Sequence, residues 1–231
     1  MRLQTAAGVK EKRLAALLAE KGRGPDDPVL AAIVEDAQLL GSLELAGVRA
    51  TWAEVRASRS GGLAPAEVAA LRRAAGAVSR DAPLTVAALR AWHTAIAGPT
   101  GFRRGPRERD GAPPAPPEAI ESRLETLEEW LGAPGSSALR PEQAAALALA
   151  RIVEVAPFDD ANGRVARLAA SHVLVRGGLR PPVLVAGDGP YLVACLRAAF
   201  RFETEPLVTL LTDASGRALD VMIQALERGE A

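Results

Sequence analysis

Residues 156–167 read Ala-Pro-Phe-Asp-Asp-Ala-Asn-Gly-Arg-Val-Ala-Arg and join two helix-forming segments near the middle of the C-terminal half. The apolar residues 144–155 before them predict a helix in the centre of the core. A second helix is expected to begin near Asn162. The backbone amides of its first turn would point into a concavity, where they favour a phosphate. The stretch therefore predicts an anion-binding loop between two core helices.

The polar side chains of this loop agree with an anion site. Arg164 and Arg167 are three residues apart, so they share a face near the start of the second helix. Basic groups oppose the helix dipole there, which costs stability unless an anion or carboxylate compensates. Arginine forks bind phosphate oxygens in pairs, and Asp160 is suited to hold Mg²⁺ that bridges phosphates. Asn162 can fix the loop or donate to a phosphate, and Gly163 lets the backbone approach a ligand closely. Ordinary helix capping is the competing interpretation of the loop chemistry alone.

The rest of the chain predicts an all-α protein. Capping residues or prolines mark most of the helix starts, and alternation typical of a strand is confined to residues 183–185. The helices are expected to follow Asp27, Thr51, Pro65, Thr85 and Pro141, with two more near 189–200 and 205–228.

Composition excludes several classes of function. Lysine plus arginine (28) equals aspartate plus glutamate (28) in the 231 residues, so a broad nucleic-acid-binding surface is not expected. Cys195 is the only cysteine, which excludes an intrachain disulfide and a cysteine-based metal site. It lies in an apolar stretch and is expected to be a small buried hydrophobe. No stretch is long and apolar enough to cross a membrane. We expect a soluble, cytoplasmic protein without a membrane segment.

Residues 98–117 differ from their surroundings. They are rich in glycine, proline and charge, which excludes a helix. The segment is long for a simple connection, so we expect either a mobile surface loop or a functional one.

The ordered string within residues 156–167 resembles the active-site motif of the Fic (Fic/Doc) family, His-x-Phe-x-Asp/Glu-Gly/Ala-Asn-Gly/Lys-Arg-x-x-Arg. Seven of its eight defined positions match, at Phe158, Asp160, Ala161, Asn162, Gly163, Arg164 and Arg167. The resemblance covers about residues 40 to 211. It implies a Fic-type helical domain with a small β-hairpin flap. It also implies that residues 160–164 and Arg167 bind ATP with Mg²⁺, and that AMP is transferred to a Ser, Thr or Tyr hydroxyl of a target protein.

The resemblance extends to two further segments. Gly101-Phe102-Arg103 is similar to the start of the family's flap, a hairpin that docks the target's side chain by strand addition. Tyr191 resembles one of the aromatic positions that flank the nucleotide base.

One departure concerns catalysis. Ala156 stands where the family has the histidine that takes the hydroxyl proton, a role that typically contributes about 10²–10⁴-fold. Neither His93 nor His172 is expected to replace it, and both are expected to have core or surface roles. Asn162, Arg164 and Arg167 are the remaining catalytic candidates. Weak residual activity stays open, because phosphoryl transfer depends heavily on positioning and charge stabilisation.

A second departure concerns regulation. Ser42 to Gly47 resembles the family's inhibitory helix, Ser/Thr-x-x-x-Glu-Gly/Asn, but Ala46 stands at the glutamate position. Arg167 is then expected to lack its inhibitory carboxylate and to stay free for phosphate. Two origins of the paired alanines stay open, deliberate replacement and natural divergence in an alanine-rich protein.

These observations predict three regions: an N-terminal helical extension at 1–26, an inhibitory-helix region at 27–60 and the Fic core at 61–231. The expected function is a protein adenylyltransferase scaffold, catalytically impaired by Ala156. The alternatives are a nucleotide-binding pseudoenzyme or interaction module, and a transferase of another phosphate-containing group such as UMP or phosphocholine. A homodimer is left open.

Overall fold

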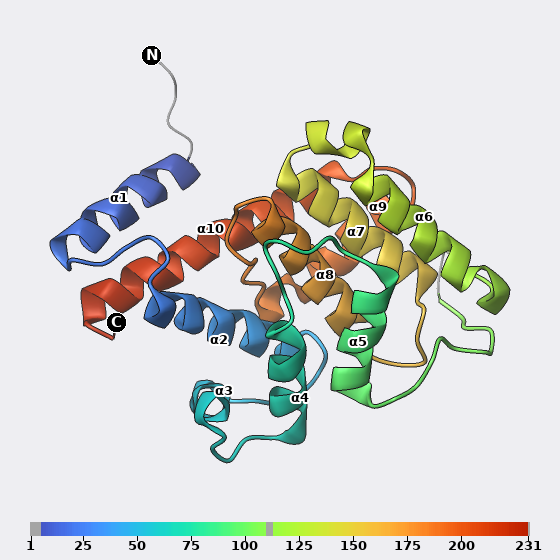
Figure 1. Cartoon of the computed structure of the whole chain (residues 1–231), viewed down its shortest axis with the longest axis horizontal. Coiled ribbons are helices and arrows are strands. Elements are labelled where there is room, and N and C mark those ends of the chain that lie inside the picture. Colours follow the sequence, from blue (N-terminus) through green and yellow to red (C-terminus); the bar gives the residue numbers. More distant parts are fainter. Residues whose placement is uncertain (1–5, 110–112, 231) are drawn as a thin grey trace.

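Two helices, α7 (Pro141–Val155) and α8 (Asn162–Arg176), pack against each other at the centre of the molecule (Figure 1). The structure is a computed structural model that describes residues 6–109 and 113–230. The helices around this pair are α1 (Ala6–Glu20), α2 (Pro28–Glu44), α3 (Trp52–Ala57), α4 (Ala66–Ala75), α5 (Val86–Ala97), α6 (Ile120–Gly132), α9 (Gly189–Ala199) and α10 (Glu205–Arg228). Short 3₁₀ turns lie at Ser58–Ser60, Pro117–Ala119, Pro134–Ala138 and Ala186–Asp188.

The predicted helix starts are confirmed. The Asp27 carboxylate accepts hydrogen bonds from the amides of Val29 and Leu30 at 2.9 and 3.1 Å, directly before Pro28. Thr51 and Glu54 form a reciprocal capping box at the start of α3. These side chains satisfy amides that a helix start would otherwise leave unpaired.

No helix is predicted for residues 120–132, yet α6 forms there. Its buried face consists of Ile120, Leu124 and Leu127, spaced by four and three residues. That spacing is typical of an amphipathic helix. The helix directly follows the proline-rich segment, and Pro117 begins the turn that leads into α6.

The all-α class is confirmed, but the expected flap hairpin differs. No strand forms in residues 6–109 and 113–230, including residues 98–109 and 183–185. Prolines at 113, 114, 116 and 117 cannot donate ladder hydrogen bonds, which explains why the chain after residue 112 does not pair as a strand. Residues 110–112, at the centre of the expected flap, lie outside the described residues. Within the described ranges, no helix is long and apolar enough to cross a membrane.

Two hydrophobic clusters make up the core. The larger one surrounds α7 and α8 and includes Ile152, Phe158 and residues 207–214 of α10. The smaller one joins Leu14 and Leu18 of α1 to α2 and to residues 218–226 of α10. Helix α10 therefore contributes to both clusters. The three-part division at residues 26 and 60 stays a prediction, although α1 and α2 pack in one cluster.

Close packing places α2 beside the central helices. A Cβ atom on Gly41 would lie 1.7 Å from the carbonyl oxygen of Leu184, so only glycine fits there. In addition, the buried Asp36 carboxylate binds Arg72 at 2.6 Å and also pairs with Arg59, which ties α2 to α4 and to the turn after α3. The next residue after Gly41 is Ser42, which this packing brings to α8.

Candidate functional site

Two alanines in the left-handed region bracket the loop between α7 and α8. Ala156 ends α7 with φ 46°, and Ala161 precedes α8 with φ 61°. A residue with a Cβ atom adopts this conformation at a cost of about 1–2 kcal/mol. The loop therefore persists because its surroundings impose its shape.

Phe158 and Asn162 fix the loop on the side that faces the core. The Phe158 side chain is fully buried. Its amide donates to Asn162 Oδ1 at 2.9 Å, and Asn162 Nδ2 donates to the Phe158 carbonyl at 2.7 Å. Asn162 thus has the loop-fixing role that was one of its two expected roles. Its contact with a phosphate stays a prediction.

His93 supports the loop in a way that the sequence did not reveal. Its ring stacks on Phe158 with centroids 3.8 Å apart and an interplanar angle of 7°. Burial lowers the pKa of His93, while a hydrogen bond to the backbone of Asp160 opposes this effect. His93 is only 1% exposed. It therefore positions the loop and does not take the place of a base at Ala156.

His172 lies in the core on α8, as expected. Its Nδ1 accepts from the Ser79 amide at 3.3 Å and its Nε2 lies 2.9 Å from the Ala82 carbonyl. Both ring nitrogens thus bind the segment after α4, not the loop. Cys195 is also buried, as expected.

Asp160 and Arg164 form an ion pair at the start of α8 in which the carboxylate is exposed and the Arg164 side chain is only 11% exposed. Arg164 Nη2 lies 3.1 Å from Asp160 Oδ2, and the Asp160 side chain is 79% exposed. The Asp160 carboxylate is therefore readily available to a ligand, while Arg164 lies beneath it beside the first turn of α8.

Arg167 corrects one expectation. It is not free, because Nε donates to Ser42 Oγ at 2.9 Å and Nη2 donates to the Ser42 carbonyl at 2.7 Å. Burial, with a smaller effect of Arg164, lowers the pKa of Arg167 to about 10. Nη1 forms no hydrogen bond or ion pair within residues 6–109 and 113–230, and it would lie 3.1 Å from a Cβ atom on Gly163. Arg167 Nη1 therefore lies beside the first turn of α8.

The inhibitory segment meets Arg167 through Ser42 alone. Ala46 and Gly47 lie in the exposed turn after α2, where Gly47 has φ 74°. None of the carboxylates in the described ranges forms an ion pair with Arg167. The inhibitory role of this segment stays a prediction.

Arg103 joins the flap segment, residues 98–109, to the end of α7. Its hydrogen bonds to both form the Arg103 clamp. Arg103 is 3% exposed, and its guanidinium donates to the carbonyls of Ala156 (2.7 Å), Gly105 (2.7 Å), Val155 (3.3 Å) and Ala115. A cation at a helix C-terminus is also favoured by the helix dipole. The Arg103 side chain therefore faces inward, and the role of this residue in docking a target by strand addition stays a prediction.

Two further arginines bind the same region. Arg107 donates to the carbonyls of Phe158 and Asp159 at 3.2 and 2.8 Å. Arg109 donates to those of Val153 and Glu154 at 2.6 and 3.3 Å. The sequence indicates these contacts only weakly, through the arginines at 103, 107 and 109 in a segment that cannot be helical. They hold the flap segment against the loop.

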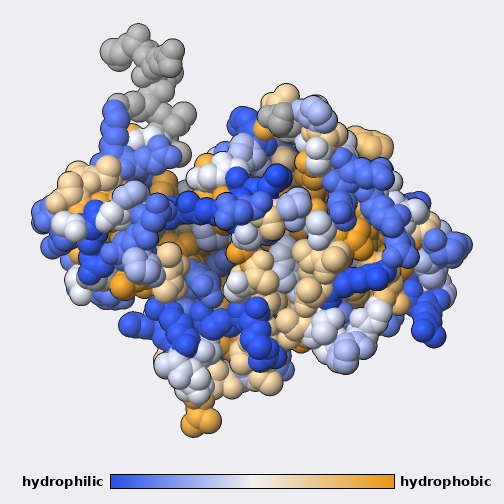
Figure 2. All heavy atoms as spheres, in the orientation of Figure 1, coloured by the Kyte–Doolittle hydropathy of each residue, from blue (hydrophilic) through white to orange (hydrophobic). Residues whose placement is uncertain are grey.

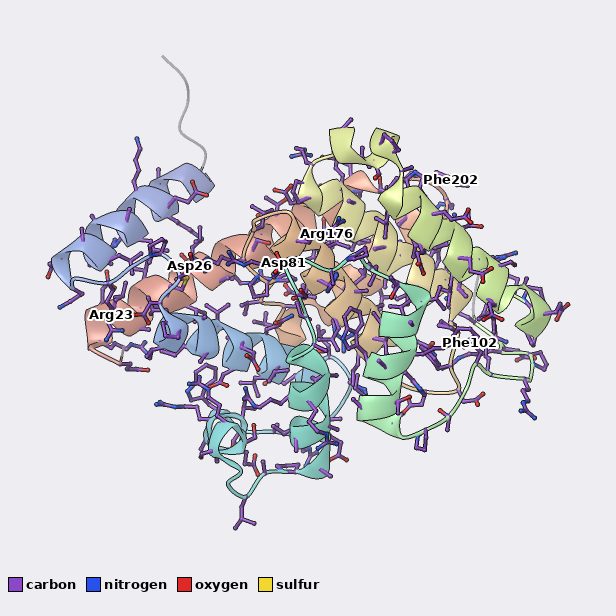
Figure 3. All side chains as sticks on the ribbon, viewed as in Figure 1. Arg23, Asp26, Asp81, Phe102, Arg176 and Phe202 are labelled. Carbon is purple, nitrogen blue, oxygen red and sulfur yellow. The ribbon has the colours of Figure 1, made fainter. Side chains whose placement is uncertain are left out.

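The other flap residues lie further out. Gly101 is exposed, and Phe102, labelled in Figure 3 on the segment after α5, is half-buried. The Phe102 ring lies 5.6 Å from that of Phe158 and under the Arg90 guanidinium. Tyr191 on α9 is 50% exposed, and its place beside a nucleotide base stays a prediction.

The carboxylates near the loop fit a magnesium ion that arrives with phosphates. Among the described residues, no group of three or more His, Cys, Asp or Glu side chains is arranged to hold a metal. Mg²⁺ in phosphate-binding sites needs only one or two carboxylates, since phosphates and water complete its shell. Asp160 can supply one.

Comparison with known proteins agrees with this geometry. A family model for the Fic/DOC family matches residues 83–174. The protein adenylyltransferase Fic of Drosophila willistoni is 31% identical over 124 residues, which is 54% of this chain and 25% of that protein. The chain thus covers about a quarter of the length of the curated relatives it matches.

Solved structures show the fold. A Fic domain containing signaling protein from Bacteroides thetaiotaomicron has a TM-score of 0.80 at 20% identity, over 97% of this chain and 98% of that one. IbpAFic2, in a crystal structure where it is covalently tethered to Cdc42, has a TM-score of 0.54 at 14% identity, over 91% of this chain and 70% of that one. The described chain therefore has the same helical fold as these proteins.

Proposed function

We propose, from the match of residues 83–174 to the Fic/DOC family model, that the chain is a protein adenylyltransferase scaffold that binds ATP with Mg²⁺. We further propose that AMP transfer to a target-protein hydroxyl is impaired in this chain because Ala156 replaces the base. The observation that carries the proposal is the cluster of Asp160, Arg164 and Arg167 Nη1 at the N-terminus of α8.

The cluster supports triphosphate binding through an exchange of partners. Asp160 would hold the magnesium ion and Arg164 would bind the phosphates, in place of their contact with each other. Charge-assisted hydrogen bonds from arginine to phosphate are stronger than the surface pair that they replace. The N-terminus of α8 adds its amides and its dipole.

The transfer step shows what Ala156 removes. The target hydroxyl oxygen attacks the α-phosphorus of ATP, the bond to pyrophosphate breaks, and the hydroxyl proton must leave. A methyl group at residue 156 accepts no proton. Asn162, Arg164 and Arg167 can still hold and stabilise the phosphates, so binding is retained while transfer is slowed.

The flap segment is proposed to dock the target protein. Arg103, Arg107 and Arg109 hold it beside the loop, which leaves Gly101 and the outer part of Phe102 toward solvent. The relative IbpAFic2, tethered to Cdc42, supports a protein as the partner. We place the reaction in the cytoplasm, without a nucleic-acid or membrane partner.

A second candidate is a nucleotide-binding module without catalysis. Two observations favour it. Ala156 cannot act as a base, and Arg167 is held by hydrogen bonds to Ser42 and by no carboxylate of the described residues. In this case nucleotide binding alone would be the function.

We expect calorimetry to show saturable binding of Mg²⁺–ATP, and Arg164→Gln to weaken it about tenfold or more. A hydrogen bond to a charged group contributes about 1.5–3 kcal/mol, and about 1.4 kcal/mol is a factor of ten in Kd. Arg176→Gln, at the far end of α8, is the matched control and should leave Kd unchanged. UTP and CDP-choline in the same titrations identify another donor. Absence of binding at millimolar nucleotide would contradict both candidates.

A further inference from the structure

Phe202 lies in the turn between α9 and α10, at a position that normally takes glycine. The Glu203 amide donates to the Ala198 carbonyl at 3.1 Å, and the Phe202 amide donates to the Ala199 carbonyl at 3.0 Å. This pair of bonds is a Schellman motif, whose residue in the left-handed region is usually glycine. Phe202 has φ 69° there, which is an outlier for a bulky side chain. The turn therefore carries its phenylalanine at a cost in stability.

The core gains little from the Phe202 side chain, which is 88% exposed. Glycine would form the same turn without strain. Backbone strain of this kind persists mainly at functional positions, such as ligand clamps and switch regions. An aromatic ring that is both strained and exposed therefore points to contact with another molecule.

The same ring lines a groove of about 470 Å³ between α6, α7 and the turn after α9. Leu127 and Trp130 of α6 and Leu147 of α7 also line it, and Trp130 is 36% exposed. Figure 2 shows hydrophobic surface at the upper right of the molecule, in the region where Figure 3 labels Phe202. Aromatic side chains around an apolar depression are typical of the centre of a protein interface. None of residues 156–167 lines the groove, so it is separate from the anion-binding loop.

The charged side chains that line the groove are both arginines, Arg123 and Arg151. Arg151 is paired with Glu154, whereas Arg123 is exposed and forms no hydrogen bond or ion pair with any described residue. No carboxylate of the described residues lines the groove. A partner that carries aspartate or glutamate beside an apolar side chain would complement this surface in both charge and hydrophobicity.

A second copy of this chain and a lipid surface both fit the groove less well. In a symmetric dimer the same patch lies on both subunits, so the arginines of one copy would face those of the other, which is unfavourable. Insertion into a membrane requires apolar side chains on a projecting surface, whereas Leu127 and Leu147 line a depression. The shape and the charge therefore favour a peptide segment.

We infer that this groove binds an acidic peptide segment of another protein, which inserts one large apolar side chain between Trp130 and Phe202. Its carboxylates pair with Arg123 beside the groove. The strained turn after α9 then has a role, because it presents an aromatic ring at the edge of the site.

Selection of short random peptides displayed on phage tests this inference. The full chain is the bait, and soluble Phe202→Gly protein removes peptides that bind elsewhere. We expect the enriched peptides to combine several carboxylates with a leucine, phenylalanine or tryptophan. Their Kd, measured by fluorescence anisotropy, should rise about tenfold or more in Phe202→Gly and in Arg123→Glu.

Two variants on the opposite side of the molecule are matched controls. Leu63→Gly removes another exposed apolar side chain, and Arg56→Glu reverses another exposed charge, on α3. Neither residue lines the groove, so both variants should leave Kd unchanged. Phe202→Gly should keep or raise Tm, because glycine relieves the strain of the left-handed conformation.

Several results would overturn the inference. One is that no peptide is enriched over the competitor, and another is that enriched peptides are not acidic or bind Arg123→Glu equally well. A clearly lowered Tm of Phe202→Gly would show that the ring supports the fold. Self-association in sedimentation velocity, or binding to phosphatidylserine vesicles, that Phe202→Gly abolishes would assign the groove to a second copy or to a membrane. No nucleotide takes part, so the outcome is independent of the proposed adenylyltransferase function.

Discussion

Ala156→His is expected to raise AMP transfer by about 10²–10⁴-fold, the usual contribution of a general base. The backbone favours this change, because residue 156 already has φ 46°. Histidine is among the residues enriched in the left-handed region, so the backbone conformation at residue 156 suits it. The measurement is incorporation of label into the protein itself and into lysate proteins, with ATP labelled at the α- or the γ-phosphate. Only the α-label should be retained.

Ala156→Asn is the control for this experiment. Asparagine also tolerates the left-handed conformation but is not a base at neutral pH. Equal labelling of the histidine and asparagine variants would remove the proposed role of residue 156. If the histidine variant binds ATP and transfers nothing, the chain is a nucleotide-binding module. Retained γ-label would indicate transfer of a different group.

Arg103→Leu is expected to destabilise the fold by about 3 kcal/mol or more. Leucine is apolar, so the carbonyls of Val155, Ala156 and Ala115 lose their donor in a buried place, and the exposed Gly105 loses a fourth bond. Each buried polar group left unpaired costs about 1–3 kcal/mol, and relaxation of the exposed segment reduces the sum. For a chain of this size a loss of 3 kcal/mol lowers Tm by about 6–12 °C. Thermal unfolding followed by circular dichroism measures it.

The neighbouring Arg104 provides a matched control. Its side chain is exposed, so Arg104→Leu should change Tm by little. Limited proteolysis should cut residues 98–109 faster in the Arg103 variant than in the Arg104 variant. Equal Tm values for the two variants would show that the clamp does not hold the flap segment.

Local signals explain which parts of the fold were predictable. Asp27 and Thr51 cap helices with side chains two or three residues away, so their effect is visible in the sequence. The contacts of Arg103 with Ala156 and of Arg167 with Ser42 join residues 53 and 125 positions apart. No local pattern reports such contacts. The motif identified the residues of the loop. It did not reveal the Arg103 clamp that holds the flap segment beside the loop, or the hydrogen bonds between Ser42 and Arg167.

The strand expectation failed for a related reason. The family resemblance supplied a hairpin, whereas the prolines at 113–117 and the arginine contacts with carbonyls favour an irregular segment. The arginine side chains thus hold the segment against the carbonyls of residues 153–159 without a strand ladder.

The position of α10 in both hydrophobic clusters has a consequence for the cooperativity of unfolding. Its residues 207–214 belong to the larger cluster and residues 218–226 to the smaller one, without a break in the helix. Loss of α1 and α2 would therefore expose half of a helix whose other half supports α7. We expect amide hydrogen exchange to be uniformly slow along α10, as in one folding unit. Fast exchange confined to its C-terminal half would show two units that unfold separately.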